Sequence, residues 1–159
     1  TSAEHVDMMN INMNIPVQLC HLFLPTLKQQ PQSYILNIAS TTAYQALPLF
    51  SVYAASKAFI LNFSRGLRYE LKKTNISVTC VSPGSTSTDF PNRADVGAKA
   101  MKNAKKVNMT PEAVACIAVK AMFQKKTEVI TGFINKLGAF FVWLLPKKFI
   151  EKTAAGFYE

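Results

Sequence analysis

Two short runs of strand-forming residues, separated by a stretch with helical periodicity, constrain the fold of this chain more than any other feature. The first run covers residues 33–39 (SYILNIA) and the second covers residues 76–81 (ISVTCV). Neither alternates cleanly between polar and apolar residues, which favours parallel strands buried on both faces. Pro83 and Gly84 follow the second run, and a central strand does not continue through them. The sequence therefore predicts a parallel sheet.

Helical patterns flank both runs. Residues 4–28 place apolar side chains at helical spacing, with a kink expected at Pro16, and residues 51–73 form a second long pattern. A third helix is expected over residues 110–124, since threonine caps helix starts and proline fits the first turn. Residues 129–130 form a brief last strand. Strands that alternate with helices in this order predict an α/β fold with a parallel sheet.

The formal charge of +9 is compatible with nucleic acid, an acidic membrane surface or an anionic small molecule as partner. The lysines are not gathered in one block, however, but stand in pairs near the expected ends of helices. These pairs are 72–73, 105–106, 125–126 and 147–148. Cations at helix carboxyl ends offset the helix dipole. We therefore do not expect nucleic acid to be a partner.

The cysteines and histidines exclude two classes of site. Cys20, Cys80 and Cys116 are odd in number, far apart and set among apolar residues, which predicts buried, reduced thiols in a cytoplasmic protein rather than disulfides. His5 and His21 have no cluster of further ligands nearby, so no metal site is expected. The first residues do not have the pattern of a secretory signal peptide.

Polar side chains follow the strands at one edge of the predicted sheet. Tyr53 and Lys57 are four residues apart, so they project from one face of a helix. Ser40 ends the first strand, and Pro83-Gly84 ends the second. Ligands of open α/β sheets bind beyond the carboxyl ends of the strands. The alternative for the Tyr-Lys pair alone is an amphipathic turn with a solvated lysine.

Together these segments resemble the short-chain dehydrogenase/reductase family. The resemblance rests on residues 37–40 (NIAS), 53–57 (YAASK) and 83–88 (PGSTST), and on residues 11–14 (INMN) followed by 24–25 (LP). It extends over nearly the whole chain and implies a Rossmann-like, doubly wound parallel sheet. It also implies an oxidoreductase that interconverts a carbonyl and an alcohol by hydride transfer, with NAD or NADP as cofactor.

The resemblance also implies roles for single residues. The catalytic set would be Ser40, Tyr53, Lys57 and Asn12, with Asn14 as a competitor of Asn12. The cofactor would contact Tyr53, Lys57, Pro83, Gly84, Thr86 and Thr88. A lysine cation about 4 Å from a tyrosine, whose usual pKa is about 10, favours the phenolate by up to ~4 kcal/mol. Relatives commonly form homo-oligomers through their two long central helices.

Part of the family pattern is missing from the sequence. None of the 159 residues form a Gly-rich dinucleotide loop, and no strand-helix-strand unit precedes the first helix. We therefore expect the C-terminal portion of a Rossmann-like fold, with residues 1–135 as its catalytic part and residues 89–104 as a substrate-covering segment. The alternative function is a binding module, or a catalytically incompetent fragment, without the cofactor pyrophosphate site.

The tail, residues 136–159, forms a separate unit of the sequence. Residues 137–145 are almost wholly apolar and too short to cross a bilayer. A buried closing helix or a subunit contact is one expectation. A peripheral membrane contact is another, because aromatic residues lie beside lysines. A wall for a lipid-like substrate is the third.

Overall fold

The computed structural model describes residues 1–88 and 108–158, and in this part three strands form one parallel sheet in the order β1-β2-β3. The strands are β1 (Ser33–Ile38), β2 (Ile76–Ser82) and β3 (Glu128–Ile130). The register runs from Ser33 opposite Ile76 to Ile38 opposite Val81, and from Cys80 opposite Glu128 to Ser82 opposite Ile130. The predicted α/β fold with a parallel sheet is confirmed.

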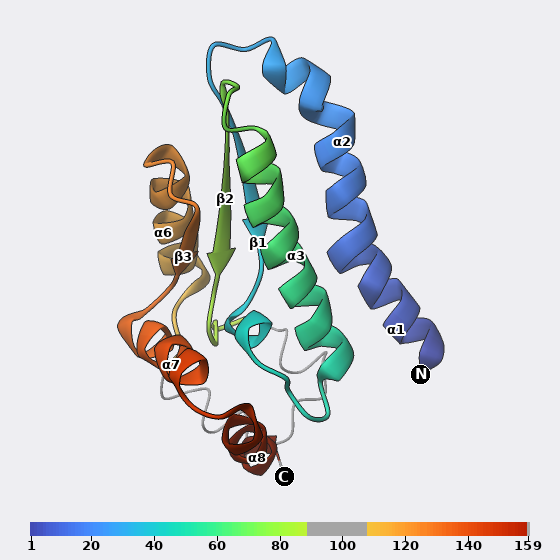
Figure 1. The fold of residues 1–159 in the computed structure, drawn as a ribbon, viewed down its shortest axis with the longest axis vertical. Coiled ribbons are helices and arrows are strands. Elements are labelled where there is room, and N and C mark those ends of the chain that lie inside the picture. Colours follow the sequence, from blue (N-terminus) through green and yellow to red (C-terminus); the bar gives the residue numbers. More distant parts are fainter. Residues whose placement is uncertain (89–107, 159) are drawn as a thin grey trace.

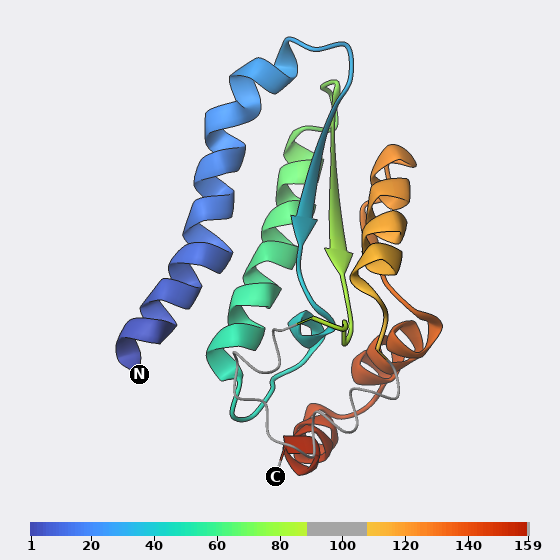
Figure 2. The ribbon, with the colours of Figure 1, turned by 180° about the vertical axis from the view of Figure 1, so that it is seen from behind.

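Helices cover both faces of this sheet. They are α1 (Ser2–Met9), the π-helical turn η1 (Asn10–Asn14), α2 (Ile15–Lys28), the 3-10 turn η2 (Thr41–Tyr44), α3 (Ser51–Glu70), α6 (Pro111–Phe123), α7 (Phe133–Leu144) and α8 (Lys147–Tyr158). The first long helix and α3 lie on one side of the sheet, and α6 lies on the other (Figure 1). The reverse view shows η2, α7 and α8 beyond the carboxyl ends of the strands (Figure 2).

The first helix is interrupted, which the apolar spacing does not reveal. It begins at a capping box of Thr1 and Glu4, and its middle is the π-helical turn η1. Pro16 has no N–H to donate to the carbonyl of Asn12 four residues earlier, and its ring would clash there. The chain accommodates the proline with a wider turn just before it. The expected irregularity therefore falls before Pro16 instead of at it.

The other helix limits follow their local sequence. Helix α3 ends at Glu70, earlier than the predicted Lys73, because the chain turns where the backbone N–H of Leu71 donates to Leu67 and Tyr69. Helix α6 has the predicted threonine cap: the side chain of Thr110 accepts from the backbone N–H of Ala113 at 3.2 Å.

The core lies on both faces of β2, whose seven residues are all buried. Toward α2 and α3 it contains Cys20, Ile35, Leu67, Leu71, Ile76 and Val78, and nearer the carboxyl edge Ala39, Ile60, Leu61 and Cys80. Strand β1, at an edge of this sheet, alternates between buried and more accessible residues. Cys116 corrects the expectation of buried thiols: α6 turns Ala118 and Ala121 inward, which leaves Cys116 exposed.

Candidate active site

The predicted convergence of polar groups is present at the carboxyl edge of the sheet. The backbone N–H of Ala39 donates to the carbonyl of Val81 at 2.7 Å, and that of Thr41 donates to Pro83 at 2.9 Å. These two bonds hold the chain beyond β1 against the chain beyond β2. Ser40, between them, therefore stands beside the Pro83-Gly84 turn.

Ser40 is fixed by its own turn. It has an extended backbone, is 8% exposed, and caps η2 with its hydroxyl oxygen, which accepts from the backbone N–H of Thr42 at 3.2 Å. This bond engages a lone pair of the oxygen and leaves the hydroxyl proton uncommitted to it. The serine is thus oriented as a cap and can still donate to an oxygen placed at the rim.

Tyr53 and Lys57 lie one turn apart on α3, and both are half-buried. The Lys57 Nζ stands 5.8 Å from the centroid of the Tyr53 ring and donates to the carbonyl of Ile38, at the end of β1, at 3.3 Å. Burial lowers the pKa of Lys57, and the nearby Cys80 thiol opposes this effect. Neither ion pair found within residues 1–88 and 108–158 involves Lys57. The ammonium group is thus held at the rim by a carbonyl and a ring.

The two asparagines of the first helix have different surroundings. The Asn12 amide donates to the hydroxyl of Ser56 at 3.0 Å, and Ser56, fully buried, donates to the Tyr53 carbonyl at 2.7 Å. The Asn14 amide instead donates to the side chain of Asn10 at 2.7 Å, within the helix. The geometry favours Asn12 as the residue connected to α3. Sequence reasoning missed Ser56, whose only signal was a small polar residue inside the Tyr-Lys motif.

The loop beyond β2 contains the predicted cofactor contacts. Thr86 forms an isolated parallel bridge with Met109, and its hydroxyl donates to the Gly84 carbonyl at 3.2 Å. The backbone N–H of Thr88 donates to Thr86 at 2.8 Å, and the Thr88 side chain is exposed. The loop is therefore braced on the segment that leads into α6. The expected substrate-covering segment, residues 89–104, lies outside the described residues.

Gly84 has a close neighbour in α7. A Cβ atom at this position would collide with the side-chain amide of Asn135, in the first turn of α7. That amide donates to the carbonyl of Thr131 at 2.8 Å. The backbone at Gly84 thus lies directly against the first turn of α7. Sequence reasoning did not find Asn135, because the two residues are far apart along the chain.

A second polar group braces the same edge from η2. The Tyr44 hydroxyl lies 3.1 Å from the Ser82 hydroxyl and hydrogen-bonds the Glu128 carboxylate. Burial, reinforced by Glu128, raises the pKa of Tyr44. Arg65 on α3 stands 3.7 Å from the same carboxylate. Tyr44 therefore links η2 to β2 and β3, a role with no sequence signal.

A cavity of about 440 Å³ opens between η2, α7 and α8. Its lining includes Thr41 and Thr42 next to Ser40, together with apolar side chains of α7. The buried hydroxyls of Thr42 and Thr131 have no hydrogen-bond partner among the described residues. Unpaired buried donors are costly, so these hydroxyls mark places where a polar ligand or water is favoured.

Known proteins of one family are similar in sequence to this chain. The sequence model for short chain dehydrogenases matches residues 1–99. The chain belongs to the short-chain dehydrogenase family. A ketoacyl reductase from Nostoc sp. is 33% identical to this family member over 131 residues, which are 82% of this chain and 44% of the relative. A 17-beta-hydroxysteroid dehydrogenase type 3 from Danio rerio is 37% identical over 82 residues, 52% of this chain and 27% of the relative. The chain thus spans less than half the length of either.

Solved structures confirm the Rossmann-like fold of this member of the short-chain dehydrogenase family. A short chain dehydrogenase from Burkholderia cenocepacia in complex with NADP superposes with a TM-score of 0.79 at 21% identity, over 97% of this chain and 60% of that one. A 7beta-hydroxysteroid dehydrogenase gives a TM-score of 0.77 at 22% identity, over 92% and 57%. The predicted membership of the family and the predicted fold are both confirmed.

Proposed function

We propose that this chain forms the catalytic part of an NAD(P)-dependent oxidoreductase that interconverts a carbonyl and an alcohol. The observation that carries the proposal is the Lys57 ammonium held over the Tyr53 ring, on the helix that faces Ser40 at the sheet edge. The names of the two relatives, a ketoacyl reductase and a hydroxysteroid dehydrogenase, point to the same pair of functional groups.

The residues present fit the nicotinamide end of such a cofactor. Lys57 brings a half-buried ammonium group whose described hydrogen bond is to the Ile38 carbonyl, so it retains donors for ribose hydroxyls. Tyr53 stands beside it, and the loop of Pro83, Gly84, Thr86 and Thr88 would hold the carboxamide. NAD or NADP, when bound, supplies or accepts the hydride.

The chain's own residues account for the proton. Tyr53 would give its hydroxyl proton to the substrate oxygen in reduction and take it back in oxidation. The Lys57 cation favours the phenolate that this transfer leaves. The Ser40 hydroxyl would donate a hydrogen bond to the same oxygen and stabilise the charge that develops there.

Asn12 would connect Lys57 to solvent. Its side chain is held by Ser56, and its carbonyl lacks the usual donor four residues ahead because that residue is Pro16. A carbonyl without this donor can accept from water, which would link Lys57 to the bulk. The wide turn η1 thus serves the proposed relay, in keeping with the frequent occurrence of π-helical turns at functional sites.

Tyr53→Phe tests the proposal. In the intact protein this variant should keep nicotinamide-cofactor binding, measured by titration, and lose turnover of a carbonyl substrate. Tyr69→Phe is the matched control, since Tyr69 lies on the same helix beside Lys72 but is 70% exposed. It should retain wild-type turnover. Substantial turnover by Tyr53→Phe would contradict the assignment of Tyr53.

The alternative function is a binding module without turnover. Titration of residues 1–159 and of the intact protein with NAD and NADP separates the two functions. If the intact protein binds neither dinucleotide, the oxidoreductase proposal fails.

We also propose homo-oligomer formation through the first long helix. This helix exposes a stripe of large apolar side chains on its outer side: Ile11, Ile15, Leu19, Leu22 and Phe23. A continuous apolar stripe of this kind is typical of a protein contact. Sedimentation of Leu22→Lys against wild type measures the contact, and an unchanged mass would contradict it.

A further inference from the structure

Helix α7 turns its large apolar side chains away from the protein. Its inward side consists of Asn135, Ala139 and Val142, which are half-buried against η2 and α8. Its outward side exposes Phe133, Ile134, Leu137, Phe140, Phe141, Trp143 and Leu144. Phe133 and Trp143 are each 79% exposed. A helix of a globular protein normally directs such residues to the core, so this orientation requires another apolar environment.

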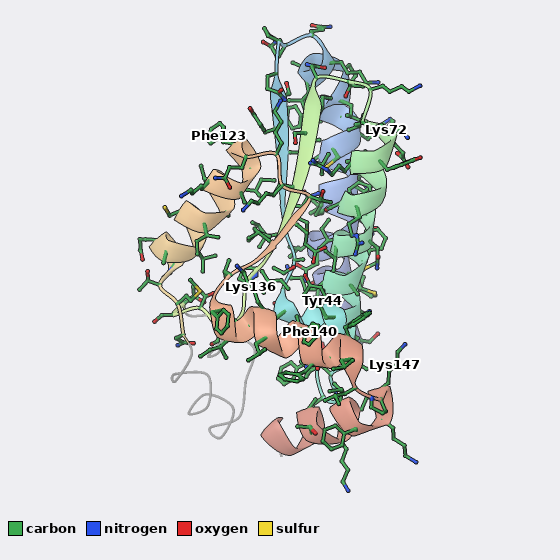
Figure 3. All side chains as sticks on the ribbon, turned by 60° about the vertical axis from the view of Figure 1, so that its left-hand side comes forward. Tyr44, Lys72, Phe123, Lys136, Phe140 and Lys147 are labelled. Atoms are coloured by element: carbon green, nitrogen blue, oxygen red, sulfur yellow. The ribbon has the colours of Figure 1, made fainter. Side chains whose placement is uncertain are left out.

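Four exposed lysines belong to the same two helices, α7 and α8. Lys136 lies within α7, and Lys147, Lys148 and Lys152 lie in the first two turns of α8. Phe149 is exposed between two of these lysines, and Glu151 is the only acidic residue among residues 133–158. Figure 3 shows Phe140, Lys136 and Lys147 at the same end of the molecule, remote from Phe123 and Lys72. The exposed apolar residues of α7, with Phe149 and the four lysines, are called the α7–α8 surface below.

We propose that the α7–α8 surface docks on an anionic phospholipid bilayer, with both helices lying in the headgroup region. Aromatic residues beside lysines suit that region, because the rings enter the acyl boundary while the ammonium groups reach the phosphates. None of the helices in the described part of the chain is long and apolar enough to cross a bilayer. The proposed contact is therefore along the membrane surface.

Charge favours a bilayer over a second copy of the chain as the occupant. A two-fold contact through the α7–α8 surface would bring the four lysines of one copy toward the same four of the other. Like charges brought together in this way repel. An anionic leaflet attracts every one of these lysines. The outer stripe of the first long helix, which has only Lys28 at its end, is a better contact between copies.

Trp143 provides a direct probe, since it is the only tryptophan of the 159 residues. The intact protein is mixed with phosphatidylcholine vesicles that do or do not contain phosphatidylserine, and whose acyl chains carry bromine. Trp143→Phe serves as the spectroscopic blank. We expect the emission of Trp143 to shift to the blue and to be quenched on the vesicles with phosphatidylserine, and quenching to decrease as salt is raised.

Two variants measure the electrostatic and the apolar contributions to vesicle binding separately. Lys148→Gln combined with Lys152→Gln should weaken binding about thirtyfold, from about 1 kcal/mol per lysine at an anionic surface. Phe140→Ser should weaken it about tenfold, from partial burial of one aromatic ring. Matched controls are Lys72→Gln and Phe123→Ser, because both residues are at the opposite end of the molecule (Figure 3). Both controls should bind as wild type.

Each other outcome overturns the proposal. Trp143 emission that is insensitive to brominated lipid excludes insertion of α7. Equal losses of vesicle binding in the control variants and in the α7–α8 variants show nonspecific adsorption. Sedimentation without vesicles tests whether a second copy of the chain binds this surface. If Phe140→Ser lowers the mass of the oligomer in solution and leaves vesicle binding unchanged, the surface is a subunit contact. Far-UV circular dichroism of each variant confirms that the fold is retained.

Discussion

Replacement of Lys57 by methionine should stabilise the fold while it removes the proposed activity. Burial lowers the pKa of Lys57, which means that the folded protein holds this ammonium group less favourably than water does. The described groups that offset the loss of water are a carbonyl at 3.3 Å and a ring centroid at 5.8 Å, both near the outer limit for such contacts. Methionine keeps the packing of the aliphatic stem and has no charge to desolvate.

The size of the gain follows from partial burial. Replacing buried ion pairs with apolar residues is often neutral or stabilises proteins by about 1–4 kcal/mol, and the half-burial of Lys57 with solvent screening places its replacement at the low end. We expect about 1 kcal/mol in the free energy of unfolding, or a rise of ~2–4 °C in Tm.

The pH dependence has a definite sign. The folded-state pKa lies below the unfolded value of about 10.4, so between the two values the unfolded chain binds more protons, and wild-type stability rises with pH. The advantage of Lys57→Met is therefore full below the folded-state pKa of Lys57 and disappears as pH rises through about 10.4.

Urea unfolding of wild type and variant, followed by circular dichroism from neutral to alkaline pH, measures both effects. Lys72→Met is the matched control: Lys72 Nζ lies 3.6 Å from the exposed Tyr69 ring, so this change should lose ~0.5–1 kcal/mol of cation–π attraction at most. A loss of 1 kcal/mol or more in Lys57→Met at neutral pH would refute the reasoning, since Lys57 would then stabilise the fold.

Three further predictions concern two contacts that hold the site and one helix glycine without contacts. Asn12→Ala and Ser56→Ala should each destabilise the fold by about 1 kcal/mol, because the hydrogen bond between these side chains is partly buried. A double-mutant cycle, measured by urea unfolding, should give a coupling energy of similar size. Additive effects of the two substitutions would mean that the bond contributes nothing to stability. Gly84→Ala should cost about 1 kcal/mol, because the new Cβ displaces the Asn135 amide from its hydrogen bond, and Asn135→Ala should suppress that cost. Gly66→Ala, at a helix position with no atom within 4 Å, should instead gain ~0.5–1 kcal/mol, as measured by thermal unfolding.

Local patterns predict the strands, the helices and the edge at which the site lies. Residues 33–38 and 76–82 are rich in strand-forming residues, and turn-forming residues follow each run. The Thr110 cap marks a helix start. Parallel strands bring their carboxyl ends together, so the proximity of Ser40 to Pro83 follows from the fold class alone. These features depend on neighbours in sequence or on topology, both of which a sequence reveals.

Contacts between distant residues were not predictable in this way. The choice between Asn12 and Asn14 depends on a hydrogen bond across 44 residues, and the helix phase that permits it is set by the π-helical turn. The Tyr44–Glu128 bond spans 84 residues. Such pairs have no periodicity, so single-sequence reasoning has no signal for them.

The apolar tail shows a second limit. Residues 137–145 are as apolar as a buried helix, yet α7 places its small residues inward and its aromatic residues outward. Hydropathy gives the composition of a helix and not the face that meets the protein. Asn135, on the inward face, lies against Gly84 and donates to the carbonyl of Thr131.

Two tyrosine–lysine pairs, one on α3 and one at its C-terminal end, show what turns a common residue pair into a candidate site. Lys57 lies over the ring of Tyr53, and Lys72, just beyond the helix, lies closer still over the ring of Tyr69. Contact between cation and ring therefore does not distinguish them. The difference is position: the first pair stands half-buried where β1 ends, and the second faces solvent at the opposite end of the helix. Burial weakens hydration of the Lys57 charge and so strengthens its action on a neighbouring phenol. The same burial that makes Lys57 costly to the fold thus makes it useful to Tyr53.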